Sequence, residues 1–301
     1  MKKTVIGIVT FGNLEFTQLA VQSVWDTVKS PYKLCIIVGK PGDGDTAGWC
    51  ARNDIPHIVH NQNYGFPYSL NDLYDFTWEH WKYDNLVTMG NDVIAYPYAI
   101  DSLISVEEKI GYDWLCSQEY NVKALVKDFP EVRPLFNGED LKFASWKEKP
   151  WERFTGWSDQ VGYDVGGGMS DTHNLALYTR SFFDQVGYID VNHYPAYFED
   201  NDLARRAILA GTKSAKVTNS YYFHFWSRTI KQGSGGSNNK FFNLNRNYYI
   251  RNWGGDFMKE RFSVPFNGAE TEIGGVRLPN SYKIDSREGE DKIIAYWRSK
   301  A

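Results

Sequence analysis

Short apolar runs alternate with longer amphipathic segments over the first hundred residues. Four of the runs are rich in Val, Ile or Leu, as is typical of strands buried on both faces of a sheet. They lie at residues 5–9, 34–38, 55–59 and 85–89. Residues 17–28 and 69–81 carry apolar side chains at helical spacing and predict two helices, the second capped by Ser69 or Asn71. This alternation predicts an α/β fold with a mainly parallel sheet flanked by helices.

The alternation of predicted strands and helices stops in the middle of the chain and resumes after it. Residues 119–168 are irregular and rich in Trp, Phe, Pro and Lys, which is typical of functional loops. A strand is expected at residues 174–178, and helices are expected at residues 180–187, 199–210, 241–252 and 291–299. Residues 232–239 consist only of Gln, Gly, Ser and Asn, and predict either a mobile lid or a passive linker.

Three loops follow predicted strands and are expected to share one crevice. In parallel sheets, ligands bind beyond the carboxyl ends of the strands. The loops at residues 10–13, 39–45 and 90–92 all occupy such positions. The sequence therefore places a candidate binding site at this edge of the sheet.

Composition and charge narrow the class of protein. The 301 residues are 42% hydrophobic with a net charge of −4, which excludes disorder and disfavours a nucleic-acid binder that relies on overall positive charge. This net charge still allows a local basic groove on the surface. Cys35, Cys50 and Cys116 are too few and too scattered for a disulfide framework or a zinc motif. No apolar run reaches the ~18 residues of a membrane span, and we expect a soluble, cytoplasmic protein with no membrane partner.

Asp92 is the first candidate for chemistry. It follows a predicted buried strand, where an unpaired carboxylate is costly unless it binds a cation or a polar ligand. The alternative is that Asn91 and Asp92 simply form a turn.

The second and third candidates are an acidic helix start and a histidine. Glu199, Asp200 and Asp202 open a predicted helix, where they either complement its dipole or supply a general base with a neighbour that shifts its pKa. His224 lies in an aromatic run and is either a metal ligand or a core histidine with satisfied hydrogen bonds.

The order of these motifs resembles inverting glycosyltransferases of the GT-A fold, in glycosyltransferase family 2. The resemblance covers roughly the first 230 residues. The matching segments are VIGIVTFGN at 5–13, NYGF at 63–66, LVTMGNDV at 86–93, VGYID at 186–190, YFEDNDL at 197–203 with Arg205 and Arg206, and His224 with Ser227. The resemblance implies a GT-A domain, a Rossmann-like α/β fold, at residues 1–230. Residues 231–301 would then form a mobile loop and a C-terminal extension packed on that domain.

The resemblance also implies roles for individual residues. It implies a nucleotide-sugar donor, with a UDP-sugar favoured, and Mn²⁺ or Mg²⁺ held by Asp92 and His224. Asp200 would be the catalytic base, Glu199 or Asp202 would orient the acceptor or the base, and Arg205 or Arg206 would neutralise the acidic cluster. The donor-binding residues would be Thr10, Phe11, Gly12, Asn13, Asn63, Gly65, Asn91 and Asp92.

Two departures from the family pattern concern the donor. The metal motif Asn91-Asp92-Val93 has one acidic position, so Asp92 would be the main protein ligand. The second strand ends in Gly39-Lys40, where the family often has an Asp that contacts the nucleotide base. Asp43 or Asp45 could take that role, and the identity of the nucleotide stays open.

The acceptor is open as well. Residues 241–255 resemble the ending of viral and phage members of the family, some of which glycosylate hydroxymethylated bases in phage DNA. The needed groove would use basic residues that otherwise form a solvated face: Lys142, Lys147, Lys149, Arg153, Lys231, Lys240, Arg246 and Arg251. A glycan or small-molecule acceptor is the alternative, and a non-catalytic sugar-binding module or a sugar-phosphate nucleotidyltransferase fits the sequence less well.

Overall fold

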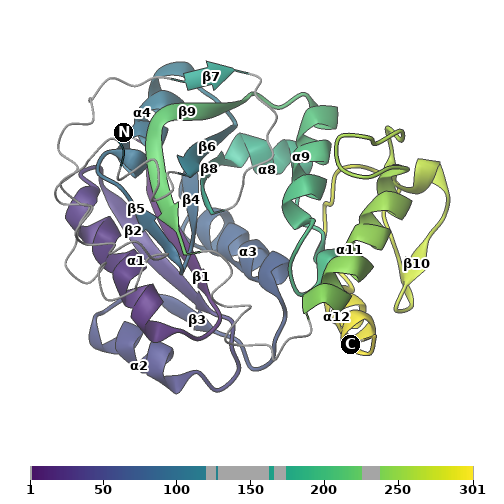
Figure 1. Cartoon of the computed structure of the whole chain (residues 1–301), viewed down its shortest axis with the longest axis horizontal. Coiled ribbons are helices and arrows are strands. Elements are labelled where there is room, and N and C mark those ends of the chain that lie inside the picture. The colour runs from purple at the N-terminus through teal and green to yellow at the C-terminus, as the bar shows by residue number, and fades with distance from the viewer. Residues whose placement is uncertain (1, 120–126, 128–162, 166–173, 226–237, 301) are drawn as a thin grey trace.

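A computed structural model describes residues 2–119, 127, 163–165, 174–225 and 238–300 (Figure 1). Four parallel strands form one half of its main sheet, in the spatial order β3-β2-β1-β4. They are β1 Thr4–Thr10, β2 Tyr32–Val38, β3 His57–Val59 and β4 Asn85–Gly90. All four predicted strands are confirmed to within two residues at each end.

The other half of the sheet is mixed. The order continues β4-β8-β6-β9-β5, with β7 paired to β9; β8 runs antiparallel to β4 and β6, and β9 runs parallel to β6. These strands are β5 Val93–Ala95, β6 Trp114–Glu119, β7 Tyr163–Val165, β8 Leu175–Thr179 and β9 Ser214–His224. The expected Rossmann-like α/β arrangement is confirmed, and the antiparallel strands are an addition to it.

Helices cover both faces of the sheet, so each strand divides its side chains between two cores. Ile6 and Ile8 of β1 pack in one core with α1 Leu14–Thr27, α2 Gly44–Arg52 and α4 Ala99–Ile110. Val5 and Val9 pack in the other with α3 Phe66–Tyr74, α8 Arg180–Val186 and α9 Glu199–Ala210. Burial on both faces is why the sequence of β1 is continuously apolar.

One N-terminal helix was not predicted and the start of another was misplaced. Residues 39–42 after β2 form the expected loop, but the unpredicted helix α2 follows, where Asp43 accepts hydrogen bonds from the Thr46 N–H (3.1 Å) and Oγ1 (2.7 Å). The second predicted helix begins earlier, at Phe66 after Gly65 (φ +85°), and continues beyond Tyr74 as a π-helix, η1 Asp75–His80. Ser69 is therefore inside the helix, where its Oγ donates to the Gly65 carbonyl at 2.9 Å.

The C-terminal segment packs beside α9 (Figure 1). It contains α11 Asn238–Trp253, η5 Pro265–Gly268, β10 Glu272–Ile273, β11 Val276–Arg277 and α12 Glu290–Arg298. Tyr248, Phe266 and Trp297 share a core with Val191 of the 3₁₀-helix η4 Val191–His193. Residues 232–237 of the predicted lid or linker lie outside the described residues, and 238–239 begin α11. No helix among those described has the length and apolar character needed to cross a membrane.

Polar contacts also join this segment to α3. Asn71, which was expected as a cap, is buried and donates to the Ile189 carbonyl (2.9 Å) and to Glu290 Oε1 (2.8 Å). Arg287 pairs with Asp72 and Asp75, each at 2.7 Å. The C-terminal segment therefore completes the hydrogen bonding of a helix in the N-terminal half.

A backbone bridge joins the same segment to the end of α8. The Tyr188 N–H donates to the Ile284 carbonyl at 2.9 Å, and the Ile284 N–H donates to the Val186 carbonyl at 3.3 Å. Gly187 lies between them with φ +78°, and a Cβ there would lie 2.1 Å from the Ile284 oxygen. Only glycine leaves room for this approach.

We predict that Gly187→Ala lowers the free energy of unfolding substantially more than Gly111→Ala. Both glycines have φ near +77°, but a Cβ at Gly111 meets no atom within 4 Å. Gly111→Ala should therefore cost only backbone strain, about 1–2 kcal/mol. Gly187→Ala should cost about 2 kcal/mol more, because the added methyl breaks the bridge and because ψ −159° at Gly187, unlike ψ +53° at Gly111, lies in a region that only glycine adopts readily. Urea unfolding of both variants measures the difference, and equal losses would contradict the packing argument.

Candidate functional site

Asp92 and His224 meet at one edge of the main sheet. Asp92 lies between β4 and β5, and His224 is the last residue of β9. The β5–β9 pairing places Val93 opposite His224, and the Phe225 N–H donates to the Asp92 carbonyl at 2.9 Å. As a result Asp92 Oδ1 lies 3.3 Å from His224 Nε2, and both side chains are largely buried. The structure therefore brings together the two residues that the sequence predicts as metal ligands.

Asn174 contacts the imidazole of His224 at Nδ1, the ring nitrogen that does not face Asp92. Its Nδ2 lies 3.4 Å from His224 Nδ1, and its carbonyl accepts a hydrogen bond from the Gly90 N–H at 3.1 Å. For Nε2 to bind a metal, the imidazole proton must be on Nδ1, which can then donate to the side-chain oxygen of Asn174 in the flipped orientation of that amide. Sequence reasoning placed Asn174 only as the start of a strand, because the contact depends on the β4–β8 pairing.

The loop at residues 10–13 joins this edge of the sheet. Asn91 is buried, and its Nδ2 donates to the Gly12 carbonyl and to Thr17 Oγ1, both at 3.2 Å. The Thr10 carbonyl accepts from the Gly39 N–H at 2.9 Å. The ends of β1, β2 and β4 therefore lie together at this edge of the sheet, where Thr10, Phe11, Gly12, Asn13, Asn91 and Asp92 were predicted to share one crevice. Donor binding by these residues stays a prediction.

The sequence named Lys40 only as a departure from the family pattern, and it named Asp43 as a possible contact for a nucleotide base. Lys40 lies over the loop: a Cβ built on Gly12 would be 3.1 Å from its Cδ and 3.5 Å from its Nζ. The ammonium group of Lys40 therefore places a positive charge beside this loop. Asp43 caps α2 with both carboxylate oxygens, and its contact with a nucleotide base stays a prediction. Asp45 lies in the first turn of α2.

Asn63 and Gly65 form a turn that packs against a different segment. Asn63 Oδ1 accepts from the Gly65 N–H at 3.0 Å, and the Phe66 N–H donates to the Pro195 carbonyl at 2.7 Å. A Cβ at Gly65 would lie 3.0 Å from the Pro195 oxygen. Packing thus accounts for the glycine, and the predicted role of both residues in donor binding stays a prediction.

The acidic start of α9 is held in an unusual backbone conformation. Tyr197 (φ +85°) and Phe198 (φ +69°) are consecutive non-glycine residues in the left-handed region, each at a cost of about 1–3 kcal/mol. The α11 helix holds them there: Phe198 packs against Tyr249 (5.7 Å between ring centroids), and Asn245 donates to the Ala196 carbonyl at 2.7 Å. Strain of this kind is concentrated at functional sites.

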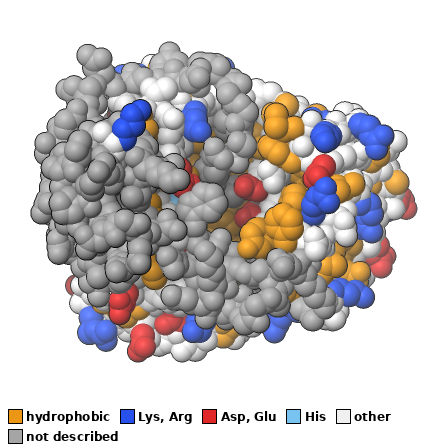
Figure 2. Space-filling model, in the orientation of Figure 1, with side chains coloured by type: hydrophobic (Ala, Val, Ile, Leu, Met, Phe, Trp, Pro, Cys, Tyr) orange, Lys and Arg blue, Asp and Glu red, His pale blue; other side chains and the backbone are white. Residues whose placement is uncertain are grey.

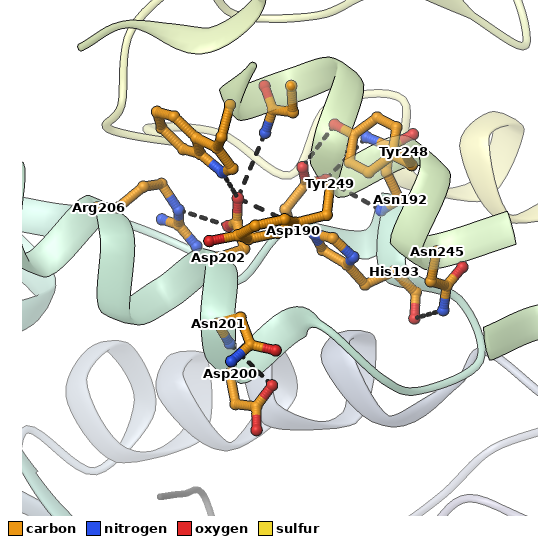
Figure 3. Close-up of polar contacts among 12 residues, drawn as sticks. Asp190, Asn192, His193, Asp200, Asn201, Asp202, Arg206, Asn245, Tyr248 and Tyr249 are labelled. Atoms are coloured by element: carbon orange, nitrogen blue, oxygen red, sulfur yellow. Dashed lines mark hydrogen bonds and ion pairs between the residues drawn. The ribbon is translucent and has the colours of Figure 1, made fainter. Parts of the chain in front are cut away.

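Asp202 faces away from the neighbouring Asp200 (Figure 3). It is buried and accepts hydrogen bonds from Arg206 Nε (2.7 Å) and Trp253 Nε1 (2.8 Å). Burial alone would raise the pKa of Asp202, but the Arg206 charge and the hydrogen bonds hold that pKa well below its ordinary value. Asp202 and Arg206 therefore form a buried ion pair, in which Arg206 neutralises one carboxylate of the acidic cluster as the resemblance implied. The role of Asp202 in orienting the acceptor or the base stays a prediction.

Glu199 and Asp200 form the predicted pair of carboxyl groups. Burial, and secondarily the charge of Asp200, raises the pKa of Glu199 to about 8. Glu199 Oε2 has no hydrogen-bond partner among the described residues. Asp200 is partly exposed, and its Oδ1 accepts from the Asn201 N–H at 2.8 Å. The raised pKa favours the protonated form of Glu199 beside Asp200, which is the arrangement expected when one carboxyl group must stay neutral for the other to be a base.

A second cluster of ligating side chains lies on the other side of α9. Asp190, His193 and Asp202 are buried, and one ligand atom from each lies within 4.8 Å of the others, so the cluster could hold a metal ion. The sequence analysis did not select Asp190 or His193 as ligands. The Asp-x-x-His spacing across η4 was the available signal, but its third member comes from α9.

Most of the basic residues predicted to line a DNA groove lie outside the described side chains: Lys142, Lys147, Lys149, Arg153, Lys231 and Lys240. Of the other two, Arg246 pairs with Asp256, and the Arg251 guanidinium lies 5.5 Å from the centre of the Phe266 ring. Ser227 is also outside the described residues. Figure 2 shows a histidine and acidic side chains within a recess on one face of the molecule.

A scan against protein-family models and a search of curated proteins found no match to this chain.

We predict that Glu199→Gln removes a pH dependence of stability. Because the folded-state pKa of Glu199 lies above its ordinary value of 4.5, its contribution to stability is fully present below about pH 4.5 and is lost as the pH rises through about 8. The substituted side chain cannot ionise. The melting temperature of the variant should therefore rise relative to that of the wild type as the pH increases from about 5 to about 8.5.

Thermal unfolding across this range checks the prediction. Asp184→Asn is a matched control, because Asp184 is an exposed carboxylate that pairs with Arg180 at the surface. Its pH profile should follow the wild type. Parallel profiles for wild type and Glu199→Gln would show that Glu199 ionises normally.

Proposed function

We propose that this protein is a metal-dependent inverting glycosyltransferase of the GT-A type, which moves a sugar from a nucleotide-sugar, in the first place a UDP-sugar, to a hydroxyl acceptor. The observation that carries the proposal is the 3.3 Å approach of Asp92 and His224 beside the crevice at the ends of β1, β2 and β4. The order of sequence motifs supports the proposal. The strained start of α9 supports it too, because it carries two neighbouring carboxyl groups, and burial raises the pKa of one of them, Glu199.

Asp92 and His224 fit a divalent cation. Neighbouring ligand atoms around an octahedral cation lie about 3 Å apart, close to the observed 3.3 Å. Two protein ligands leave positions for phosphate oxygens, and a histidine beside a carboxylate favours Mn²⁺ over Mg²⁺. When bound, the cation would stabilise the negative charge that develops on the diphosphate leaving group.

The chain's own residues would bind the donor from the crevice. Asn91 fixes the loop at residues 10–13 against β4 through the Gly12 carbonyl and Thr17. Lys40 brings a second positive charge beside that loop. Both features suit an anionic ligand of nucleotide-diphosphate size lying across the sheet edge.

Asp200 would be the general base. Its carboxylate would take the proton of the acceptor hydroxyl as the hydroxyl oxygen forms a bond to the anomeric carbon. The bond from that carbon to the diphosphate oxygen breaks on the opposite side, so the configuration inverts. A protonated Glu199 beside Asp200 limits the acceptor side to one negative charge, and the hydroxyl of its carboxyl group can orient the base.

Asp200→Asn should lower the rate of transfer by about 10²–10⁴-fold and leave the donor Kd nearly unchanged, because the amide cannot accept the proton. Transfer kinetics and calorimetric donor binding check both parts. Asp184→Asn, on the surface of α8, should match the wild type. Wild-type turnover in Asp200→Asn would reject the assignment of the base.

Asp92→Asn should remove the part of donor affinity that depends on Mn²⁺. The amide keeps the shape of the side chain but not its charge, so donor binding with Mn²⁺ should fall to the level seen with chelator. Titration of the donor with and without Mn²⁺ measures this difference. An unchanged Kd in the presence of Mn²⁺ would overturn the role of Asp92.

A donor screen tests the function as a whole. UDP-, GDP- and dTDP-sugars are incubated with Mn²⁺ and with candidate acceptors, and the released nucleoside diphosphate is measured. Release that increases with hydroxymethylated duplex DNA identifies the DNA acceptor, and release that increases with glycans or small alcohols identifies the alternative. Binding without release would indicate a sugar-binding module. Pyrophosphate formation from a nucleoside triphosphate and a sugar phosphate would indicate a nucleotidyltransferase.

A further inference from the structure

We propose that Asp190, His193 and Asp202 form a second metal site, which takes Zn²⁺ and fixes the start of α9. These residues come from η4 and α9, and all three are buried. This site shares no residue with the pair of Asp92 and His224. The role proposed for its ion is structural and not catalytic.

His193 is the observation that points to a ligand. Its side chain is fully buried, and neither ring nitrogen has a hydrogen-bond partner among the described residues. A buried polar group that lacks its partner destabilises the folded state. Nε2 is directed at Asp202, 3.9 Å from Oδ1, which is too long for a hydrogen bond. An ion between them would satisfy this nitrogen.

The two carboxylates are held in place by neighbouring groups. Asp190 Oδ1 accepts from the Asn192 backbone N–H (2.9 Å) and side chain (2.7 Å), and its Oδ2 accepts from the Tyr248 hydroxyl (2.7 Å) (Figure 3). Asp202 is held by Arg206 and Trp253, as described above. Metal-binding carboxylates in proteins are typically oriented by outer hydrogen bonds of this kind.

The charge and size of the site favour one Zn²⁺. Two buried carboxylates face one guanidinium, that of Arg206, so the cluster carries excess negative charge when His193 is neutral. Ligand atoms around a tetrahedral Zn²⁺ lie about 3.3 Å apart, so the pair at 3.9 Å needs only a small contraction. A mixed set of one imidazole and two carboxylates suits Zn²⁺, whereas Mg²⁺ prefers an octahedron of oxygens with several waters.

A cavity gives the site a path to solvent and room for a fourth ligand. It has a volume of about 880 Å³ and is lined by Asp190, Asp202, Asn252 and the segment 275–286. A water from this cavity would complete the tetrahedron. Since Asp202 lies two residues after Asp200, an ion here would fix the first turn of α9, which carries the proposed base.

Metal analysis of the full-length protein tests the proposal. Protein stripped with a chelator is loaded with Zn²⁺, passed through gel filtration, and assayed for bound zinc and for thermal unfolding. We expect one retained Zn²⁺ per chain and a raised melting temperature in the wild type, and loss of both in His193→Gln. His60→Gln is the matched control: His60 is equally buried beside a carboxylate, Asp72, at 2.6 Å, but it lacks a second acidic partner in a ligating cluster. No retained zinc, or zinc retained equally by His193→Gln, would overturn the site.

Two further measurements keep the test decisive. If His193→Gln does not fold, Co²⁺ loading of the wild type should give the visible absorption of a four-coordinate ion, and its absence would overturn the proposal. His224→Gln should keep the retained Zn²⁺ while losing Mn²⁺-dependent donor binding. The zinc site and the proposed transferase activity can therefore fail independently.

Discussion

The buried pair of Asp202 and Arg206 is the interaction on which the candidate site depends. A charge placed in the interior must be paired and hydrogen-bonded, and removal of one partner typically costs about 3–5 kcal/mol. Asp202 meets this requirement with contacts from its own helix and from Trp253 of α11, while Arg206 Nη1 donates to the carbonyls of Val186 and Tyr188. These contacts fix the position of α9 and, with it, the direction in which Asp200 leaves the helix. The residue that sets the geometry is therefore different from the residue that would perform the chemistry.

The pair formed by Asp92 and His224 depends on strand register. His224 meets Asp92 because β9 pairs with β5 in a register that places Val93 opposite His224. A slip by one residue would turn the imidazole to the other face of the sheet. Asn174 belongs to the same arrangement, since the β4–β8 pairing carries it to the ring. Three segments distant in the sequence therefore have to pair correctly before the predicted metal ligands exist as a site.

Local pattern predicted the four parallel strands of the N-terminal half, β8 and most helices, because burial on two faces and helical spacing are visible in the sequence. It missed α2, where only Thr46 and Cys50 are buried and the entry is rich in glycine. It also missed α4 and the strands β5, β6, β7 and β9. At the site, Asp92, Asp200 and His224 could be selected from motif order, and the opposite direction of Asp202 could have been inferred, because residues two apart on a helix point to different sides. Lys40, Asn174 and His193 could not be selected, since their significance arises from contacts with segments far along the chain.

The link between Asn71 and Glu290 has a consequence for synthesis of the protein. Asn71 lies in α3 and uses its amide to join Ile189 to Glu290, so its hydrogen bonds are complete only after residue 290 has left the ribosome. Domains generally fold from the N-terminus as they emerge. Here the sheet can pair early, but the hydrogen bonds that join α3 to residues 189 and 290 must wait for α12. The order of translation thus delays the final packing of α3 until residue 290 has been made.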